Sequence, residues 1–501
     1  MKQLSAAARI GGFLLLLALL LTGISKVVER KDSHTRMDLF FTRAPQTDVL
    51  LLGDSMVLNG VYPQELWNRF GITAYNMACF NDTLPVEYWT LMNCLDYGTP
   101  KVVVIGVKDV NDDKRVSRMS GNVHDAFDAF PLTLTKARAL FDLMANSDEA
   151  DHDGVRYSDQ LIEFLFPLAK YHGRWSELTD ADLHPAQGVQ LGAEQVVRVF
   201  NPDDYTILED VEPSPEEGRG YLYLRKMIEE CQNRGIQVIL MEMPHPSDEE
   251  TQAYDARVQL IAEEYNITFC DFVRMDAVVE YKIDCQDPKT HLNPSGGRKV
   301  TAYLGDMLAN DGLQDHRADP AYAAWNAGYE AYLNYKADLF AQQEDYKAAL
   351  MLLHDPDFDC VISVKKGVRL NKNKLYELLQ NVCRRDLTEA DIGSTSSAEE
   401  CPLSEIDYAL ENQEAYLLVT DRAQDGFYEQ SCGGWAEVQQ SWGTVQYWRD
   451  DAELEITLVQ DGQSTTYFTT EEEQEADLCV LAVDRRTGKP CAGLHFDIEK
   501  K

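Results

Sequence analysis

Two short motifs in this sequence carry residue types that suit acyl-transfer chemistry. Gly53-Asp54-Ser55 follows an apolar run over residues 47–52, and His291 lies in THLNPSGGRKV, just before a helical pattern over residues 295–310. A serine hydroxyl is a weak nucleophile until a neighbouring base accepts its proton, and histidine is the most frequent base. The two motifs therefore predict Ser55 as a nucleophile and His291 as its general base.

Such a pair needs a group that orients the imidazole and donors that stabilise an oxyanion. Asp287 and Asp284 precede His291 by four and seven residues, and the nearer, Asp287, is the first choice. The oxyanion candidates are the backbone N–H of Ser55, the side chain of Asn76 and a group from the turn Gly106-Val107-Lys108-Asp109.

Further polar residues are candidates for substrate contacts. His172 and Arg174, with Trp175, lie in KYHGRWSEL, where they would line a groove for an anionic or glycan substrate or, alternatively, form a packing cluster at a helix end with a cation–π contact. His245 follows a predicted strand and either faces the site or belongs to the core.

The elements around these motifs predict an α/β fold. Short apolar runs at residues 47–53, 73–78, 101–107, 237–244 and 267–272 are typical of buried parallel strands, and helical patterns separate them. Strands that alternate with helices favour a parallel sheet covered on both faces. Ser55 would then lie at the carboxyl edge of the sheet, where open α/β folds hold their sites.

The chain of 501 residues is too long for one ordinary core, so we expect several domains. The predicted parts are a cytoplasmic tail at 1–9, a transmembrane signal-anchor at 10–25, a stalk at 26–46, the α/β domain at 47–312 with a helical insertion at 113–216, a connecting helix at 313–353, and a smaller β-rich or α/β C-terminal domain at 354–501. In this last domain, LEITLVQDGQSTTYF predicts a hairpin with Asp461-Gly462 at its turn, and the role of the domain is open.

The N-terminal apolar run has two interpretations. It is shorter than the roughly 20 residues of a comfortable span and long enough for the core of a signal peptide. LTGISKVVERK after the run is a poor cleavage site, which favours an uncleaved anchor. Positive charges flank the run on both sides, and we expect the large acidic domain to lie outside the cytoplasm, at the cell membrane.

Composition excludes some partners and cofactors. The net charge of −38 argues against nucleic-acid binding, because no basic stripe offsets it. Eleven cysteines include no CxxC pair and no cysteine–histidine cluster with zinc spacing, so we expect no metal and no cofactor.

At the Ser55 and His291 motifs the sequence resembles the SGNH/GDSL hydrolase superfamily. More narrowly, it is similar to membrane-anchored SGNH-like proteins related to cell-envelope O-acetyltransferases and to the D-alanyl-lipoteichoic acid protein family. The matching segments, within about residues 47–310, are DVLLLGDSMVLNGVYPQELWNRFGITAYNMACF, KVVVIGVKDV, EFLFPLAKYHGRWSEL and DPKTHLNPSGGRKVTAYLGDML.

The resemblance implies a three-layer α/β/α fold and a metal-free triad of Ser55, His291 and Asp287. Three positions depart from the family pattern. Asp287 is one residue further from the histidine than usual, Asn76-Met77-Ala78 replaces a block with a glycine donor, and Lys108 replaces an asparagine.

Two hypotheses for function follow. The first is a serine esterase or O-acyltransferase, which would act through an acyl-serine on ester-linked acyl groups of a cell-envelope polysaccharide or on a small acyl ester. The second is a non-catalytic envelope scaffold or glycan-binding protein that keeps the fold. The altered blocks favour the scaffold, and the intact Ser55 and His291 favour the enzyme.

Overall fold

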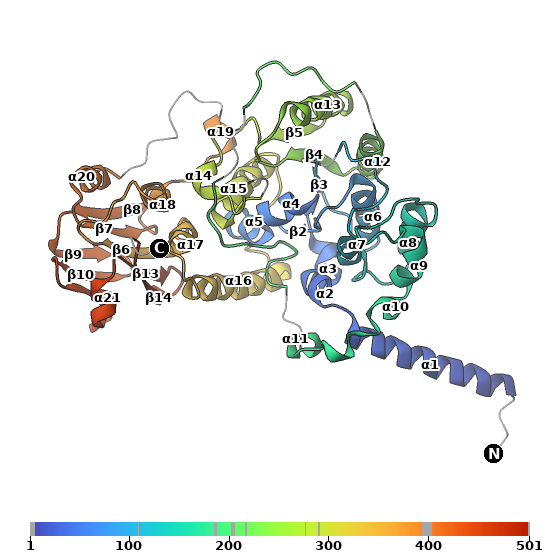
Figure 1. The fold of residues 1–501 in the computed structure, drawn as a ribbon, viewed down its shortest axis with the longest axis horizontal. Coiled ribbons are helices and arrows are strands. Elements are labelled where there is room, and N and C mark those ends of the chain that lie inside the picture. The colour runs from blue at the N-terminus through green and yellow to red at the C-terminus, as the bar shows by residue number, and fades with distance from the viewer. Residues whose placement is uncertain are drawn as a thin grey trace.

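The computed structural model describes residues 6–108, 110–184, 188–201, 206–215, 218–275, 277–288, 291–392 and 403–498. Three parts follow one another along the chain: an N-terminal helix, a mixed α/β domain and a β-rich C-terminal domain (Figure 1). The predicted α/β class and the β-strands of the C-terminal region are both confirmed.

Five parallel strands form the sheet of the α/β domain, in the order β2-β1-β3-β4-β5. The central strands are runs of apolar, largely β-branched residues, as expected of strands with helices on both faces. All five predicted strands are present. Their bounds are β1 Val49–Leu52, β2 Ala74–Asn76, β3 Val102–Gly106, β4 Gln237–Glu242 and β5 Thr268–Asp271.

Helices cover both faces of this sheet and make three layers (Figure 1). Side chains alternate along each strand, so Leu50 and Val103 pack with α6, α12 and α13, whereas Leu51 and Val104 pack with α4, α5 and α15. The bounds are α4 Ser55–Gly60, α5 Pro63–Phe70, α6 Leu84–Cys94, α12 Arg219–Asn233, α13 Glu249–Tyr265, α14 Tyr281–Asp284 and α15 Pro294–Asn310.

A helical segment interrupts the α/β alternation between β3 and α12. It has its own apolar core, which includes Phe127, Leu140 and Phe164 and continues onto Val86 of α6. The segment therefore packs beside α6 as a lateral extension of the domain (Figure 1). Its helices are α7 Ser120–Phe127, α8 Leu134–Leu140, η2 Phe141–Ala145, α9 Tyr157–Leu165, α10 Leu168–Tyr171, η3 Arg174–Ser176 and α11 Asp180–Leu183.

The N-terminal helix α1 Ala6–Val28 projects from the α/β domain (Figure 1). Its stretch Ala8–Val28 has a mean hydropathy of 2.1, and no part of the window that defines this stretch is buried in the protein. At 1.5 Å per residue, the 21 residues of this stretch reach about 30 Å, the thickness of a bilayer core. This helix is longer than the predicted span of 10–25, and it is long and apolar enough to cross a membrane or act as a signal anchor.

The segment predicted as a stalk is folded onto the α/β domain. Met37 and Phe40 are almost fully buried and belong to the same core cluster as Tyr75 of β2. Phe40 also makes an edge-to-face contact with Tyr75. A free spacer would expose these side chains. The apolar residues of this segment therefore hold the domain close to the end of α1. The short helices are α2 Asp32–Met37, α3 Phe40–Arg43 and η1 Ala44–Gln46.

The C-terminal domain is a sandwich of two antiparallel sheets with helices on its outer side. One sheet has the order β14-β13-β6-β7-β8 and the other β12-β11-β10-β9. The predicted hairpin with Asp461-Gly462 at its turn joins β11 to β12, and both turn residues have positive φ. The strands are β6 Phe358–Val364, β7 Tyr416–Asp421, β8 Gly426–Ser431, β9 Gly434–Gln440, β10 Gly443–Arg449, β11 Leu454–Gln460, β12 Gln463–Tyr467, β13 Leu478–Asp484 and β14 Lys489–Phe496.

Two helices rather than one join the domains. Trp325 of α16 packs on Trp67 of α5, and Leu350 of α17 packs in the core of the C-terminal domain with Leu379 of α18. The remaining helices are η4 Pro320–Tyr322, α16 Ala323–Ala341, α17 Tyr346–Leu352, α18 Leu375–Cys383, α19 Glu389–Ile392, α20 Glu405–Asn412 and α21 Glu471–Glu475.

Candidate active site

Ser55 is the first residue of α4, directly after β1 and a sharp turn. Asp54 caps this helix, because its carboxylate accepts a hydrogen bond of 2.9 Å from the N–H of Met56. The N–H of Ser55 is one of the first-turn donors that lack an intrahelical acceptor. The turn therefore presents a hydroxyl and a backbone donor together at the carboxyl edge of the sheet.

Glycine is required at two positions of this turn region. Gly53 has a φ of +150°, and a Cβ there would lie 2.5 Å from Cγ2 of Val57. A Cβ on Gly106, at the end of β3, would lie 2.6 Å from the same methyl group and 3.2 Å from Cα of Gly53. Neither contact is possible for a real side chain, so the two glycines let β1 and β3 end close together beneath Ser55.

Asp287 and His291 lie in one loop between α14 and α15. The N–H of Asn293 donates to the carbonyl of Asp284 at 2.8 Å, and the N–H of Gln286 donates to the carbonyl of His291 at 3.0 Å. A further bridge pairs Cys285 with Leu292. These bonds close the base of the loop, so the two functional side chains extend from a hairpin-like frame.

The structure brings Ser55, His291 and Asp287 into one chain of hydrogen bonds. Nε2 of His291 lies 2.8 Å from Oγ of Ser55, and Nδ1 of the same ring lies 2.5 Å from a carboxylate oxygen of Asp287. Asp287 and His291 expose 33% and 24% of their side chains, whereas Ser55 is only 8% exposed. This arrangement allows the imidazole to accept the serine proton while the carboxylate stabilises the resulting imidazolium.

A buried network holds the base of the His291 loop from the C-terminal domain. Lys299 of α15 makes an ion pair of 2.7 Å with Asp284 and donates to Oδ1 of Asn381 at 2.8 Å. The amide of Asn381, in α18, donates in turn to the hydroxyl of Ser295 at 3.0 Å. Asn381 was not predicted, because nothing local in α18 indicates that it reaches Ser295, 86 residues earlier.

Asn293 is a second residue that the sequence analysis left without a role. Its Oδ1 accepts from the N–H groups of Ser295 and Gly296, and its Nδ2 donates to the carbonyl of Ile283 at 2.7 Å. It therefore caps α15 and ties that helix to the opposite side of the loop. Its place two residues after His291 in the HLN motif was the available signal.

Asn76 braces the serine turn instead of facing the reacting position. Its Nδ2 donates to the carbonyls of Val57 and Val61, at 2.9 and 3.0 Å, and its Oδ1 accepts from the N–H of Ala78. Both amide hydrogens are thus used to hold the end of α4. This placement does not support the predicted oxyanion role, because neither hydrogen is left for a substrate.

Lys108 follows β3 at the same edge of the sheet, among buried acids. Burial raises the pKa of Asp54, and the hydrogen bond from the N–H of Met56 and the positive charge of Lys108 oppose that shift. Burial, and then the charge of Asp255, hold the pKa of Glu242 well above its ordinary value, again against Lys108. Lys108 therefore supplies positive potential beside Ser55. Asp109, named with it as an oxyanion candidate, lies outside the described residues.

His245 belongs to this buried region. Its side chain is 2% exposed, and its Nδ1 lies 2.9 Å from the carbonyl of Met243. Burial, together with the charge of Lys108, lowers its pKa to about 3. The ring is therefore neutral at ordinary pH and belongs to the core, which was one of its two predicted positions.

His172 and Arg174 are not brought together with the triad. Nη1 of Arg174 donates to the carbonyl of Val28 at 2.8 Å, at the end of α1, and Nη2 pairs with Asp182 at 3.1 Å. His172 is exposed at the end of α10, where its Nδ1 lies 2.8 Å from the carbonyl of Ala169. Arg174 therefore packs against the end of the N-terminal helix, close to the predicted alternative of a packing cluster, whereas His172 remains exposed.

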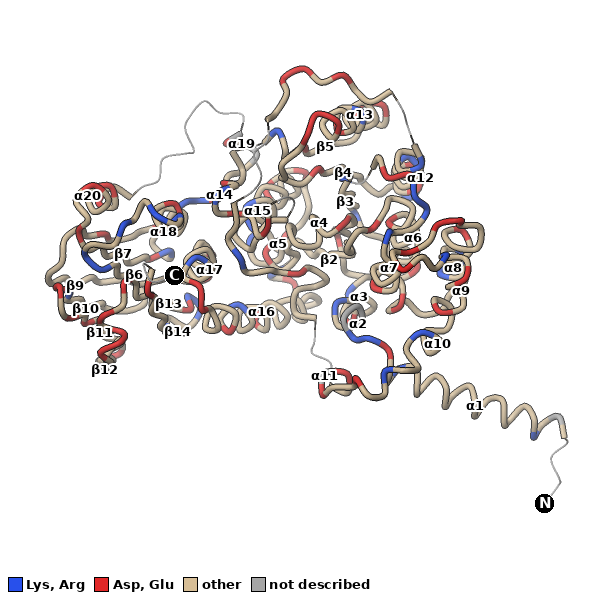
Figure 2. The backbone as a smooth tube through the Cα atoms, in the orientation of Figure 1, with Lys and Arg blue, Asp and Glu red and all other residues tan. Residues whose placement is uncertain are grey.

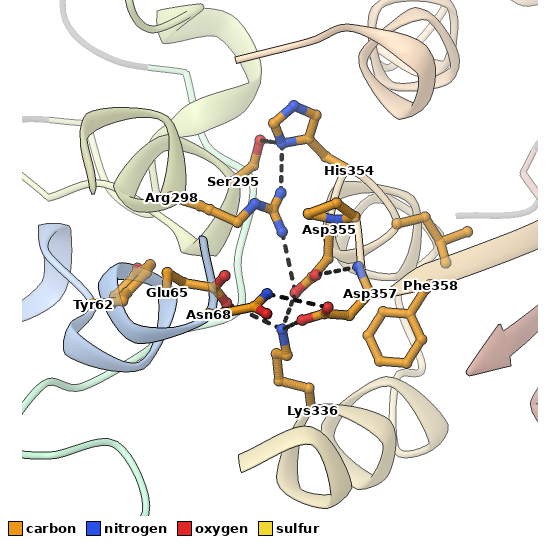
Figure 3. Close-up of polar contacts among 12 residues, drawn as sticks. Tyr62, Glu65, Asn68, Ser295, Arg298, Lys336, His354, Asp355, Asp357 and Phe358 are labelled. Carbon is orange, nitrogen blue, oxygen red and sulfur yellow. Dashed lines mark hydrogen bonds and ion pairs between the residues drawn. The ribbon is translucent and has the colours of Figure 1, made fainter. Parts of the chain in front are cut away.

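A carboxylate cluster between the domains has the composition of a metal site. Within the described residues, oxygens of Glu65, Asp355 and Asp357 lie within 4.8 Å of one another. Nζ of Lys336 lies among them, 3.1 Å from Glu65 and 2.9 Å from Asp355, and pairs with Asp357 as well (Figure 3). An ammonium group thus takes the position that a cation would occupy, and the cluster does not fit a metal.

Comparison with known proteins finds no family model that matches the chain and no curated sequence that matches it.

Proposed function

We propose that the chain is an SGNH-type serine esterase or O-acyltransferase, anchored in the cell membrane by α1, with its folded domains outside the cytoplasm. The observation that carries the proposal is the hydrogen-bond chain from Ser55 through His291 to Asp287, with distances of 2.8 and 2.5 Å. The SGNH-type assignment rests on the motifs around these residues and on the three-layer arrangement of the sheet and helices.

The reaction proceeds in two halves. Nε2 of His291 accepts the proton of Ser55 as Oγ bonds to the acyl carbon of the ester, and the carbonyl electrons move onto its oxygen. The tetrahedral intermediate collapses, the C–O bond to the sugar breaks, and His291 returns the proton to the departing hydroxyl. Water or a second hydroxyl then attacks the acyl-serine by the same route, which gives hydrolysis or transfer.

The oxyanion would be stabilised from the serine turn and from β3. The N–H of Ser55 points from the first turn of α4, and Lys108 adds a positive charge at the neighbouring strand end. This assignment replaces the amide of Asn76, whose hydrogens bond Val57 and Val61. The proposed acyl donors are ester-linked acyl groups of cell-envelope glycans.

A serine-reactive fluorophosphonate tests the proposal directly. We expect the wild type to be labelled and Ser55→Ala to remain unlabelled. Ser247→Ala is a matched control, because Ser247 is also buried near the carboxyl edge of the sheet and its hydroxyl makes only a long contact of 3.5 Å. Folded wild-type protein without label would favour the non-catalytic scaffold, and label that survives Ser55→Ala would place the nucleophile elsewhere.

Topology needs its own experiment. A reporter that is active only in the cytoplasm, fused after Lys501, is expected to stay silent in cells that express the full chain. An active reporter would place the C-terminal domain inside the cell and overturn the extracytoplasmic part of the proposal without affecting the chemistry.

A further inference from the structure

A groove of about 590 Å³ lies between the α/β domain and the C-terminal domain. Its walls come from the end of α5, from α16, from the loop before β6, and from the C-terminal domain at residues 384–386, 422–425 and 485–486. None of its lining residues belongs to the Ser55 triad. Its volume is in the range of small-ligand sites, about 300–1,000 Å³.

The charge of this groove opposes that of the rest of the chain. The net charge is −38, and acidic residues are spread over both domains (Figure 2). The groove nevertheless gathers six arginines against four carboxylates. Four of these arginines form ion pairs with carboxylates in or near the groove, and the other two are Arg422 and Arg485. Its histidine, His354, is neutral, because burial and the surrounding cations hold its pKa well below the ordinary value. The arginines are Arg69, Arg384, Arg385, Arg422, Arg485 and Arg486.

Arg422 is held rigidly by groups that do not neutralise it. Its Nε donates to the carbonyl of Phe358 at 2.8 Å, and its Nη2 donates to the carbonyls of Leu353 and Val382 at 2.7 and 2.6 Å. Within the described ranges, its Nη1 has no hydrogen-bond partner and no carboxylate lies within 4 Å of the guanidinium. A fixed guanidinium with a free N–H pair is preorganised for an anionic oxygen.

Arg485 contributes a second positive charge of the same kind. It is exposed, and its Nη1 donates to the carbonyl of Pro356 at 2.8 Å. No carboxylate in the described part of the chain forms an ion pair with it. Arg422 and Arg485 come from different strand connections, β7–β8 and β13–β14, and both line the groove. The domain arrangement therefore assembles two unneutralised guanidinium groups around one hollow.

We propose that this groove binds an anionic oligomer through phosphate or carboxylate oxygens. Guanidinium groups recognise both kinds of oxygen in planar, charge-assisted hydrogen bonds. An oligomer fits better than a single ion, because the arginines line several segments around a hollow much larger than one anion. The site would lie across the two domains, and it stands independently of the chemistry proposed for Ser55.

Titration calorimetry of the full chain in detergent tests this site with three probes: tripolyphosphate, tri-galacturonate and neutral maltotriose. We expect saturable binding of at least one anionic probe, weakened by added salt, and no binding of maltotriose. Arg485→Gln should bind at least tenfold more weakly, since this side chain is exposed and a charged hydrogen bond to an anionic oxygen is worth about tenfold or more.

Two control variants make the outcome decisive. Arg118→Gln removes a side chain that is 74% exposed on the helical segment and should bind as the wild type does. Ser55→Ala should also bind normally, which separates this site from the proposed catalytic centre. Binding of tripolyphosphate alone would identify phosphate as the ligand group, and binding of tri-galacturonate alone would identify carboxylate. The proposal fails if neither probe binds, or if Arg118→Gln weakens binding as much as Arg485→Gln does.

Discussion

Two clusters of ionisable side chains in this molecule use similar groups and differ in their contact with water. At the sheet edge, Asp287 and His291 keep 33% and 24% of their side chains exposed. Between the domains, the side chains of Lys336, Glu65 and Asp355 are only 5%, 1% and 8% exposed. The first cluster reaches the surface at Asp287 and His291, whereas the second is closed on itself (Figure 3).

The difference separates the proposed catalytic site from a cluster that stabilises the fold. Burial alone would lower the pKa of Lys336, but the surrounding carboxylates hold it well above its ordinary value. Such a group keeps its proton at every ordinary pH and cannot serve as an acid or base. His291, in contrast, has one ring nitrogen on a carboxylate and the other on a hydroxyl. Proton transfer requires such an arrangement, in which one nitrogen can accept a proton while a carboxylate stabilises the charged ring. The buried cluster lacks it.

The largest expected effect is at the nucleophile. Ser55→Ala should lower kcat for p-nitrophenyl acetate hydrolysis by at least about 10⁵-fold, because the proposed acyl intermediate forms on its Oγ. Steady-state kinetics on folded protein, checked by circular dichroism, measures this. If the activity of Ser55→Ala stayed within tenfold of the wild-type value, Ser55 would not be the nucleophile.

The orienting carboxylate should come next. Asp287→Asn should lower kcat by about 10³- to 10⁴-fold with little change in KM, since an amide would favour the wrong tautomer of His291. Asp284→Asn is the matched variant, because Asp284 was the other candidate and is instead bound to Lys299 at 2.7 Å. If Asp284→Asn lost more kcat than Asp287→Asn in folded protein, the assignment of the orienter would be reversed.

Removal of Lys336 should affect stability and spare the chemistry. Lys336→Met leaves the buried carboxylate of Glu65 without its cation and leaves Asp355 with Arg298 alone, which should cost about 3–5 kcal/mol of unfolding free energy. Urea unfolding measures the loss, and kcat per folded molecule should stay near the wild-type value. Lys366→Met, at an ion pair whose lysine is 52% exposed, should leave the unfolding midpoint unchanged. Equal effects of the two variants would contradict the contrast between buried and exposed pairs.

Asp255 differs from both clusters, because it is buried near the candidate active site and its carboxylate is only partly paired. Burial, and then the charge of Asp271, raise its pKa to about 7, whereas Lys108 and Arg274 lower it. Its unfolded pKa is near 3.8, so the folded state binds the proton more tightly and stability falls as pH rises from about 4 to 7. Between pH 5 and pH 8, the free energy of unfolding of Asp255→Asn should fall by about 1–3 kcal/mol less than that of the wild type. Unfolding curves at the two pH values measure this difference. Parallel pH profiles for both proteins would contradict the shift.

The smallest effect is expected at the positioning residue Asn381. Asn381→Ala leaves the hydroxyl of Ser295 and the ammonium of Lys299 each without one partner, which should loosen the His291 loop. We expect kcat to fall about fivefold to tenfold, a loss near one hydrogen bond, with KM unchanged. Gln380→Ala, whose amide bonds the hydroxyl of Tyr376 instead, is the control. Equal kcat values for both variants would show that the C-terminal domain does not position the loop.

The sequence by itself determined the parallel sheet and the position of Ser55 after its first strand. Buried parallel strands are continuous apolar runs, and each run here is bounded by a turn that the printed residues reveal. The hairpin at Asp461-Gly462 was also predictable from local sequence, because Asp-Gly favours a two-residue turn in which both residues have positive φ. The N-terminal helix was also foreseen, although its ends extend beyond the predicted span.

Only the tertiary structure decided which polar groups remain free for chemistry. Asn76 is a plausible oxyanion donor in the sequence, yet its amide holds the end of α4. Arg174 suggested a substrate groove, yet it bonds the end of α1. Lys299 and Asn381 meet only after two domains pack together. Local sequence determines backbone preference and apolar pattern. The partner of a hydrogen-bonding group depends on atoms that lie 15 to 146 residues away in these examples, which no short pattern encodes.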